Sequence, residues 1–497
     1  MTSGKQPENF HFGSLSEPIF VIMAMNQCHL STLCIYQFSP GRCPVDPTIA
    51  QIIQDFDLDG YRPIAHRALD LDTPLEPRAG NLATVVMGVR RCGKTYRLFQ
   101  EMDTLLAKGV SPERLLYFNF EDTRLPAVTP EVGDAVLQTY FELHPESYRQ
   151  GAYLFLDEIQ EMRDWDAWLR HAIDTTRATI YVTGSSSKLL SEEVASAFRG
   201  RSVTYELAPY GFGELVRLRE PDLANALQGA LVPTSEQAAR AKHLFQGYLE
   251  RGGFPAVQDV SLRRAVAVLQ GYAQRAVAKD VIERHNLSNP QAMQAFARRL
   301  LATSGRTLSL RKVEDTLRSQ GVSVGRNSLA QALEYFEDAF LVGTVRDFSR
   351  ALAPKGNAMP KVYAVDHGLA MANSPAAAQD TGQRLESLVY NELRRRRAGG
   401  RPGEIAKLTC TQGNYEVDFL VGDALLQEGF ELIQVCERVD ERRTLARELR
   451  ALDAAMAEQG LTEGWLLVGE GDVRELEVAH GVVHQLPVWL WTLKTAD

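Results

Sequence analysis

Short apolar runs alternate with amphipathic stretches through the first half of the chain. Three runs are rich in β-branched or aromatic residues and end at polar or glycine positions: Leu82–Met87, Ala152–Leu156 and Ile180–Val182. Such runs are typical of buried strands. After the first run, leucine and methionine recur at helical spacing until Gly109. The pattern predicts an α/β fold in which helices connect the strands of one sheet.

The second half of the chain shows two further patterns. Apolar positions recur at helical intervals from about 213 to 304. A helix that begins at Leu310, a helix over Asn327–Ala339 and strands around Leu341–Val345 and Val362–Val365 then follow. Beyond residue 381 we expect a helix, two strands, the strand ELIQVCERV, a helix over about 443–459 and the strand WLLVG. This order predicts a second α/β unit.

Length and composition narrow the class of protein. The chain has 497 residues, enough for roughly three or four domains. Its six cysteines include no CxxC pair, which is typical of a reduced, cytoplasmic protein. No apolar run approaches the roughly 20 residues that span a bilayer, so we expect no membrane association. Residues 1–50 match no domain pattern, and we interpret them as an N-terminal extension.

Charge is distributed unevenly. The formal net charge is −9, yet residues 261–330 contain twelve lysines and arginines against four acids, a local charge of +8. The rest of the chain therefore carries −17. This asymmetry indicates a segment that faces a polyanion such as DNA.

The stretch GVRRCGKT fits the phosphate-binding pattern GxxxxGK[ST] between a predicted strand and a predicted helix. Glycine lets main-chain N–H groups approach phosphate oxygens, and the helix N-terminus adds unpaired donors. Lys94 would contact the β- and γ-phosphates, and Thr95 would ligate Mg²⁺. A glycine turn with solvated charges is the alternative. The residues assigned to nucleotide binding are Gly88, Val89, Arg90, Arg91, Cys92, Gly93, Lys94 and Thr95.

Asp157 and Glu158 end the second apolar run. The carboxyl ends of parallel strands face the ligand crevice. We therefore expect Asp157 to complete the Mg²⁺ shell and Glu158 to act as general base on the attacking water. An acidic pair that caps a helix is the alternative interpretation.

Hydroxyl and arginine side chains follow the third run. One serine of SSS, with Ser186 as the candidate, would sense the γ-phosphate, although turn chemistry explains serines equally well. In FRGRS, Arg199 or Arg201 would stabilise transition-state charge, in cis or on a neighbouring subunit. A surface salt bridge is the competing interpretation.

These motifs together carry a resemblance. GVRRCGKT, LFLDEIQ, VTGSSSKLLS, FRGR, LAPYGFGEL and YLERGGFPAV occur in the order seen in prokaryotic AAA-type ATPases of the archaeal-type group. The resemblance runs from about residue 50 to the end, and Cys92 departs from it because many relatives have a small apolar residue there. It implies an ATPase that uses ATP and Mg²⁺. The implied domains are a P-loop core over 51–212, a helical lid over 213–304, a winged helix over 305–372 and a nuclease-like domain over 373–497.

The implied winged helix suggests a way to contact DNA. Its second helix would enter the major groove with Arg326, Asn327, Ser328 and Gln331, while Arg311, Lys312 and Arg318 lie on phosphates. The same helix carries Glu334, Glu337 and Asp338, which would repel phosphate. Contact with DNA and a role between domains therefore both stay open.

The C-terminal unit resembles the PD-(D/E)xK nuclease fold, an α/β restriction-endonuclease-like domain. Glu386 and Asp418 match two acids of that pattern. Gln434 stands where the next acid belongs, and Cys436 stands where the lysine belongs. Because a carboxylate and the lysine that would activate water are missing, this resemblance implies a catalytically degraded site.

Three functions follow from the sequence. The first is an ATPase whose nucleotide state moves the winged-helix and nuclease-like parts against a partner, either DNA, another protein or a second copy of the chain. The second is a DNA-binding regulator or defence protein that uses ATP as a switch. The third is an ATP-gated, metal-dependent nuclease.

Overall fold

The computed structural model describes residues 46–72, 74–185, 200–228, 233–348, 359–374, 379–398, 404–411, 413, 415–423 and 428–494. All of them belong to one contact unit, Val45–Asp497. The first element, α1 (Pro47–Asp55), crosses the expected domain boundary at residue 50. Asp46 caps it by accepting hydrogen bonds from Thr48 and Ile49 N–H, and Ile49 and Ile52 are buried. The first described helix thus begins just before the predicted core.

A five-stranded sheet forms the first half of the described chain. Its strands are β1 (Ala83–Met87), β2 (Leu115–Asn119), β3 (Ala152–Asp157), β4 (Ala178–Gly184) and β5 (Ser202–Glu206). They lie in the order β2-β3-β4-β1-β5, and every neighbouring pair is parallel. The three apolar runs of the sequence are β1, β3 and β4. The sequence analysis missed β2 and β5, the two edge strands, because their residues alternate or lie partly exposed.

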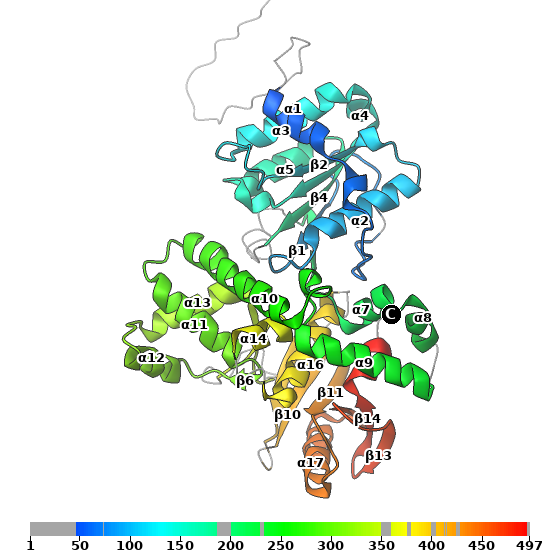
Figure 1. The fold of residues 1–497 in the computed structure, drawn as a ribbon, viewed down its shortest axis with the longest axis vertical. Helices are drawn as coiled ribbons and strands as arrows, with labels where there is room; N and C mark the ends of the chain where they lie inside the picture. Colours follow the sequence, from blue (N-terminus) through cyan, green and yellow to red (C-terminus); the bar gives the residue numbers. More distant parts are fainter. Residues whose placement is uncertain are drawn as a thin grey trace, which may run out of the picture. The chain divides into compact units, whose positions relative to one another are not determined.

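Helices lie on both sides of this sheet. They are α2 (Lys94–Ala107), α3 (Pro130–Leu143), α4 (Pro145–Gln150) and α5 (Trp165–Thr175), with 3₁₀ turns at Leu58–Tyr61, Pro112–Arg114 and Ile159–Glu161. Figure 1 shows α2 on one side of the strands and α3 and α5 on the other. The strand order explains this arrangement, because right-handed crossovers from β1 to β2 and from β2 to β3 run in opposite directions.

The helical region contains α7 (Phe212–Arg219), α8 (Pro221–Gln228), α9 (Ser235–Arg251), α10 (Leu262–Ala276) and α11 (Pro290–Ala302). A 3₁₀ turn at Pro255–Val257 precedes α10, and a π-helix at Val277–Glu283 follows it. Apolar residues of α7, α8 and α9 belong to the same buried cluster as those of the C-terminal unit, whereas those of α10 and α11 join the cluster of the parallel sheet. The expected lid is therefore divided between two cores.

A small three-stranded sheet follows. Its order is β6-β8-β7, with β6 (Arg306–Thr307), β7 (Val342–Val345) and β8 (Lys361–Ala364). Between β6 and β7 lie α12 (Leu310–Ser319) and α13 (Arg326–Asp338), and α14 (His367–Asn373) follows β8. The predicted order of helix, helix, strand and strand is confirmed. Whether the unit acts as a winged helix stays a prediction.

The C-terminal unit is a six-stranded mixed sheet with helices. Its order is β13-β14-β12-β11-β10-β9, in which β11, β12 and β14 run parallel and the other pairs are antiparallel. The strands are β9 (Glu404–Thr409), β10 (Glu416–Asp423), β11 (Glu428–Cys436), β12 (Glu463–Val468), β13 (Arg474–Val478) and β14 (Gly481–Pro487). The helices are α16 (Thr381–Ala398), α17 (Arg442–Gln459) and α18 (Val488–Lys494). Nowhere in the described ranges is a helix both long and apolar enough to cross a bilayer.

Candidate nucleotide site at the end of the parallel sheet

The loop between β1 and α2 begins and ends with glycines that the backbone requires. Gly88 has a φ of +151°, and a Cβ there would lie 2.0 Å from Leu207 O, just beyond β5. Gly93 has a φ of +107°, and a Cβ there would lie 3.2 Å from Arg67 Nη1. Side chains at either position would collide with or crowd their neighbours, so the loop keeps its curvature only with glycine.

Main-chain donors remain unpaired where the loop enters α2. Cys92 N–H donates to Val89 O at 3.3 Å. Lys94 N–H lies against the Cys92 thiol, whereas the N–H groups of Gly93 and Thr95 have no hydrogen-bond acceptor within the described ranges. Unpaired donors at a helix N-terminus, where the helix dipole is positive, bind anions. The loop therefore has the property that phosphate binding requires.

Lys94 connects the loop to the end of β3. Its Nζ donates to Gly88 O at 3.2 Å and lies 3.6 Å from Glu158 Oε1. The Lys94 side chain is only 3% exposed, so its charge is poorly screened by water. The ammonium group lies beside both the glycine loop and the acid that the sequence pairs with it.

Asp157 is held by three hydroxyl groups. Thr95 Oγ1 donates to its Oδ2 at 2.8 Å, Tyr117 donates to the same oxygen at 2.9 Å, and Thr183 donates to Oδ1. Burial raises the pKa of Asp157 above its usual range, and the charge of Glu158 raises it further. Carboxylate and hydroxyl oxygens are ligands that Mg²⁺ accepts, so Thr95 and Asp157 fit the metal of a magnesium nucleotide.

Glu158 has a left-handed backbone conformation, with φ of 53°, that is uncommon for a residue with a side chain. Its N–H donates to Thr183 Oγ1 at 2.9 Å, and Gln160 Nε2 donates to Glu158 Oε2 at 2.5 Å. Burial alone would raise the pKa of Glu158, but the charge of Lys94, the Gln160 amide and Arg90 lower it below the usual range. Glu158 is thus ionised at neutral pH and can accept a proton.

Arg90 joins the loop to the π-helix. Its guanidinium contacts Asp280 at 2.9 Å, Glu121 at 3.2 Å and Glu161 at 3.4 Å. Asp280, from the π-helix, is buried and also pairs with Arg284 at 3.1 Å. Ser185, at the end of β4, donates to Asp280 at 3.5 Å. Single π-turns recur at functional sites, and this one carries the carboxylate that binds the nucleotide loop.

Arg67 supports the loop from the other side, although the sequence analysis did not select it. The residue is 2% exposed and donates to Cys92 O at 2.8 Å, Ala208 O at 2.7 Å and Glu214 Oε1 at 2.9 Å. Burial alone would raise the pKa of Glu214, but Arg67 outweighs it and lowers that pKa to about 2. Glu214 belongs to the quoted motif LAPYGFGEL, so a carboxylate amid apolar residues was the available signal.

Of the serine and arginine residues predicted to act at the γ-phosphate, the structure describes only Arg201. Ser186 and Arg199 lie outside the described residues. Arg201 precedes β5, where its C=O accepts a hydrogen bond from Ala83 N–H, and its side chain pairs with exposed Asp174. Ala83 begins β1 and Gly88 follows its end, so Arg201 lies about 16 Å from the loop along the strand. In this arrangement Arg201 pairs with Asp174 and does not contact the loop of its own chain, which favours a role across a subunit boundary over one in cis.

The four residues assigned to a degraded nuclease site do come together. Glu386 on α16 and Asp418 on β10 share one partner, Lys361 of β8, at 3.2 and 3.0 Å. Gln434 Nε2 donates to Glu448 at 3.0 Å, and Cys436 Sγ donates to Arg438 O at 3.1 Å. These residues line a cleft of about 560 Å³. Lys361 could not be selected from the sequence because it lies on β8, before the nuclease-like unit, and Glu448 could not be selected because its helix carries no position of the acid and lysine pattern.

The side chains expected on DNA are partly neutralised. Arg318 and Arg326 both pair with Glu314, at 2.7 and 3.2 Å. Arg311 and Lys312 are exposed, and neither forms a salt bridge within the described ranges. Only the latter pair presents free charge to a phosphate backbone.

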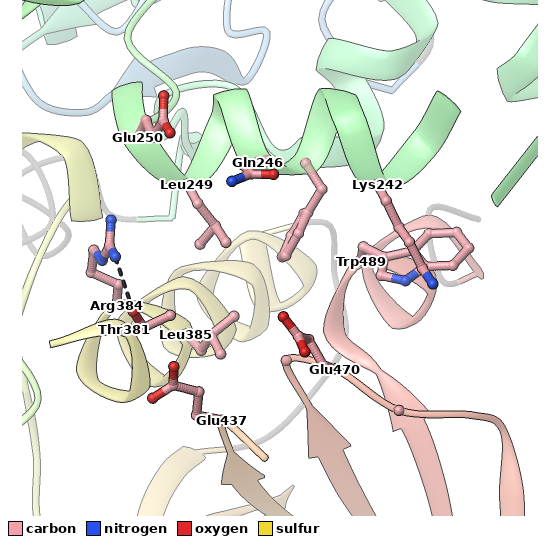
Figure 2. Close-up of a pocket in the computed structure, with 13 residues that line it drawn as sticks. Lys242, Gln246, Leu249, Glu250, Thr381, Arg384, Leu385, Glu437, Glu470 and Trp489 are labelled. Atoms are coloured by element: carbon pink, nitrogen blue, oxygen red, sulfur yellow. Dashed lines mark hydrogen bonds between the residues drawn. The ribbon is translucent and has the colours of Figure 1, made fainter. Parts of the chain in front are cut away.

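A second cleft, of about 520 Å³, lies between α9 and the C-terminal unit. Figure 2 shows Lys242, Gln246 and Leu249 reaching from α9 toward Leu385 and Trp489. None of the residues assigned to the nucleotide loop lines this cleft. It is therefore separate from the site around Lys94.

Comparison with known proteins agrees with this geometry. The AAA domain family matches residues 80–216, and a second family, described only as a domain of unknown function, matches residues 242–380. The protein MJ1544 of Methanocaldococcus jannaschii is 30% identical over 433 residues, covering 85% of this chain and 90% of that protein. The chain belongs to the MJ1544 family and contains a P-loop AAA domain.

Further matches include one more relative and one solved structure. A protein of Haemophilus influenzae is 26% identical over 362 residues, covering 72% of this chain and 84% of the relative. Among solved structures, the Aeropyrum pernix ORC1 protein in complex with DNA is 17% identical, covers 65% of this chain and 91% of that chain, and has a TM-score of 0.26. The match to the unknown domain spans the expected boundary between lid and winged helix at residue 304.

Proposed function

We propose that the AAA domain binds a magnesium nucleoside triphosphate, ATP, at residues 88–95 and hydrolyses it slowly. One observation carries the proposal. The end of β3 brings Asp157 to Thr95 and Glu158 to Lys94, next to the unpaired N–H groups of Gly93 and Thr95 at the start of α2. A structural acidic pair would not need free donors beside it. These are the parts that phosphoryl transfer uses to position and neutralise charge.

Each side chain has a distinct role in this proposal. Lys94 and the N–H groups of Gly93, Lys94 and Thr95 bind phosphate oxygens. Thr95 and Asp157 hold Mg²⁺, which neutralises charge that develops on the phosphates. Glu158 accepts a proton from the attacking water because its pKa is lowered and it stays ionised. Ser186 and Arg199 remain candidates at the γ-phosphate, and Arg201 remains a candidate across a subunit boundary.

The nucleotide state is coupled to the rest of the chain through two charged contacts. Arg90 binds Asp280 of the π-helix, which leads into α11 and the expected winged helix. Arg67 binds Cys92 O of the loop and Glu214 of α7. A phosphate that attracts Arg90 competes with Asp280 for the same guanidinium. The loop can therefore transmit its occupancy to both helical groups.

DNA binding is a second candidate, with ATP as a switch. It rests on exposed basic side chains of α10, α11 and α12 that form no salt bridge within the described ranges: Arg263, Arg264, Arg298, Arg299, Arg311 and Lys312. Such charges bind phosphate backbones without reading sequence. An ATP-gated nuclease is the third candidate and rests on the proximity of Glu386 and Asp418.

ATP turnover with and without duplex DNA tests the first proposal. Lys94→Ala should abolish nucleotide binding and phosphate release, whereas Lys108→Ala, which removes an exposed lysine just after the same helix, should leave both unchanged. Wild-type protein that binds no magnesium nucleoside triphosphate would overturn it.

DNA retention distinguishes the second candidate. ATP-dependent retention with negligible turnover would favour a switch. Retention should weaken with salt, and Arg311→Ala with Lys312→Ala should reduce the slope of log K against log salt by about 2.

A further inference from the structure

One ammonium group on β8 is surrounded by carboxylates of the C-terminal unit. Lys361 Nζ lies 3.0 Å from Asp418 Oδ1, 3.2 Å from Glu386 Oε1 and 3.3 Å from Glu416 Oε1. Lys361 is 9% exposed. Tyr363, two residues along the same strand, donates to Glu386 Oε1 at 2.6 Å. The strand thus supplies two donors to the acids that the nuclease pattern selects.

The acids are fixed in this arrangement by other bonds. Asp418 Oδ2 accepts from Val435 N–H at 3.0 Å, while Asp418 N–H donates to Gln434 Oε1 at 3.1 Å. Both oxygens of the Asp418 carboxylate are therefore engaged, one by the lysine and one by the main chain of β11. Glu386 Oε1 accepts from Lys361 and Tyr363 together. None of these contacts requires a ligand from outside.

The metal that the nuclease resemblance implies does not fit these residues. A divalent cation bridging Glu386 and Asp418 needs oxygens at about 2.0–2.6 Å, and Lys361 Nζ lies at the point where both carboxylates converge. Gln434 offers an amide that is engaged with Glu448, and Cys436 bonds to Arg438 O. Across the ranges that the structure describes, no group of three acidic, histidine or cysteine side chains is arranged to hold a metal ion.

We propose that the ammonium group of Lys361 occupies the position of a metal ion between Glu386, Glu416 and Asp418. Its ion pairs with these carboxylates hold β8 against the C-terminal sheet. The nuclease-like unit then serves as a docking base for the three-stranded sheet β6-β8-β7, and cuts no phosphodiester bond. The proposal is independent of ATP chemistry at the loop, since neither Lys361 nor its partners touch residues 88–95.

The charge balance supports this role. Burial and the negative charge of Asp418 raise the pKa of Glu386 to about 7, even with Lys361 alongside. Without the ammonium group, two buried carboxylates would repel each other with no compensating charge. Breaking one partner out of a buried ion cluster is strongly destabilising, whereas removing the whole cluster is much less so.

A rescue experiment on the full chain tests whether the ion pairs of Lys361 stabilise the fold. Lys361→Met should lower Tm by roughly 5–10 °C. Adding Glu386→Gln and Asp418→Asn to Lys361→Met should recover at least half of that loss. The two acid substitutions alone should destabilise, because they leave Lys361 with only the exposed Glu416 as a counter-charge. Lys242→Met, at an exposed lysine of α9, is the matched control and should leave Tm unchanged.

Manganese titration of the nucleotide-free chain, followed by electron paramagnetic resonance, tests whether the carboxylates around Lys361 bind a metal ion. Wild-type protein and Asp418→Asn should give the same binding curve. Mn²⁺ binding that Asp418→Asn abolishes in the wild-type background would overturn the proposal, and so would a Lys361→Met chain as stable as wild type. If Lys361→Met does not fold, recovery of a folded chain in the triple variant supports the proposed ion pairs of Lys361, and failure of the triple variant to fold contradicts them. ATP turnover should persist in the triple variant, which separates this result from failure of the proposed ATPase.

Discussion

Two lysines of this chain lie among carboxylates, and their surroundings differ. Lys94 begins α2 beside Glu158, next to N–H groups that have no acceptor within the described ranges. Lys361 lies on β8 and contacts three carboxylates at 3.0–3.3 Å. Unpaired N–H groups at a helix N-terminus can bind an anion, so the donors near Lys94 support the proposed nucleotide site. Lys361 and its three carboxylate partners instead form ion pairs within the chain, and these pairs require no external ligand.

The most direct test of this comparison is to remove one acid from each site. Glu158→Gln should lower kcat for ATP by about 10²- to 10⁴-fold while nucleotide affinity is retained, because the variant loses only the proton acceptor. Glu386→Gln should leave kcat unchanged. Phosphate release and nucleotide binding measure both effects. Equal losses in the two variants would show that the sites do not differ in the proposed way.

Arg67 extends the comparison because its buried guanidinium pairs with Glu214 and also contacts the nucleotide loop. Arg67→Met leaves the buried Glu214 carboxylate without its counter-charge, so we expect a loss of about 3–5 kcal/mol in the free energy of unfolding. The double variant with Glu214→Gln should recover part of it. Denaturant unfolding followed by tryptophan fluorescence provides the measurement. A double variant as unstable as the sum of the two single variants would contradict a direct pair.

The pH dependence of stability follows from Glu214. Its pKa in the folded chain is about 2, below the ordinary 4.5. The ionised carboxylate therefore contributes stability that is fully present above about pH 4.5 and is lost as pH falls toward 2. The shift corresponds to roughly 3 kcal/mol. Acid unfolding followed by circular dichroism should be less steep in Glu214→Gln over this range, and identical curves would argue against the shift.

The smallest effect is expected at Arg201. Its partner Asp174 is 44% exposed, and exposed ion pairs contribute at most about 1 kcal/mol. Arg201→Ala should thus barely change stability, and turnover should be unchanged if the chain acts alone. Turnover that falls in Arg201→Ala and recovers on mixing with Lys94→Ala chains would instead show that Arg201 acts on a neighbouring subunit.

Much of the nucleotide site could be predicted from local sequence. The pattern around Gly88 and Lys94 identifies the loop, and the apolar run before Asp157 places that acid at a strand end, because both signals depend on neighbouring residues. Thr183, Tyr117 and Arg67 could not be selected in this way. Their contacts with Asp157 and Cys92 arise only when strands far apart in the sequence pair side by side.

The sequence by itself determined the buried strands and most helices, the glycine loop and the acids at the end of β3, since periodicity and short motifs carry that information, but it did not reveal the edge strands β2 and β5. Tertiary structure alone decided which charges are matched. Lys361 precedes Asp418 by 57 residues and Glu386 by 25, and only the pairing of separate sheets and helices brings the ammonium group to the carboxylates. Motif spacing records which residue is missing from a pattern, and it contains no information on which distant side chain fills its place.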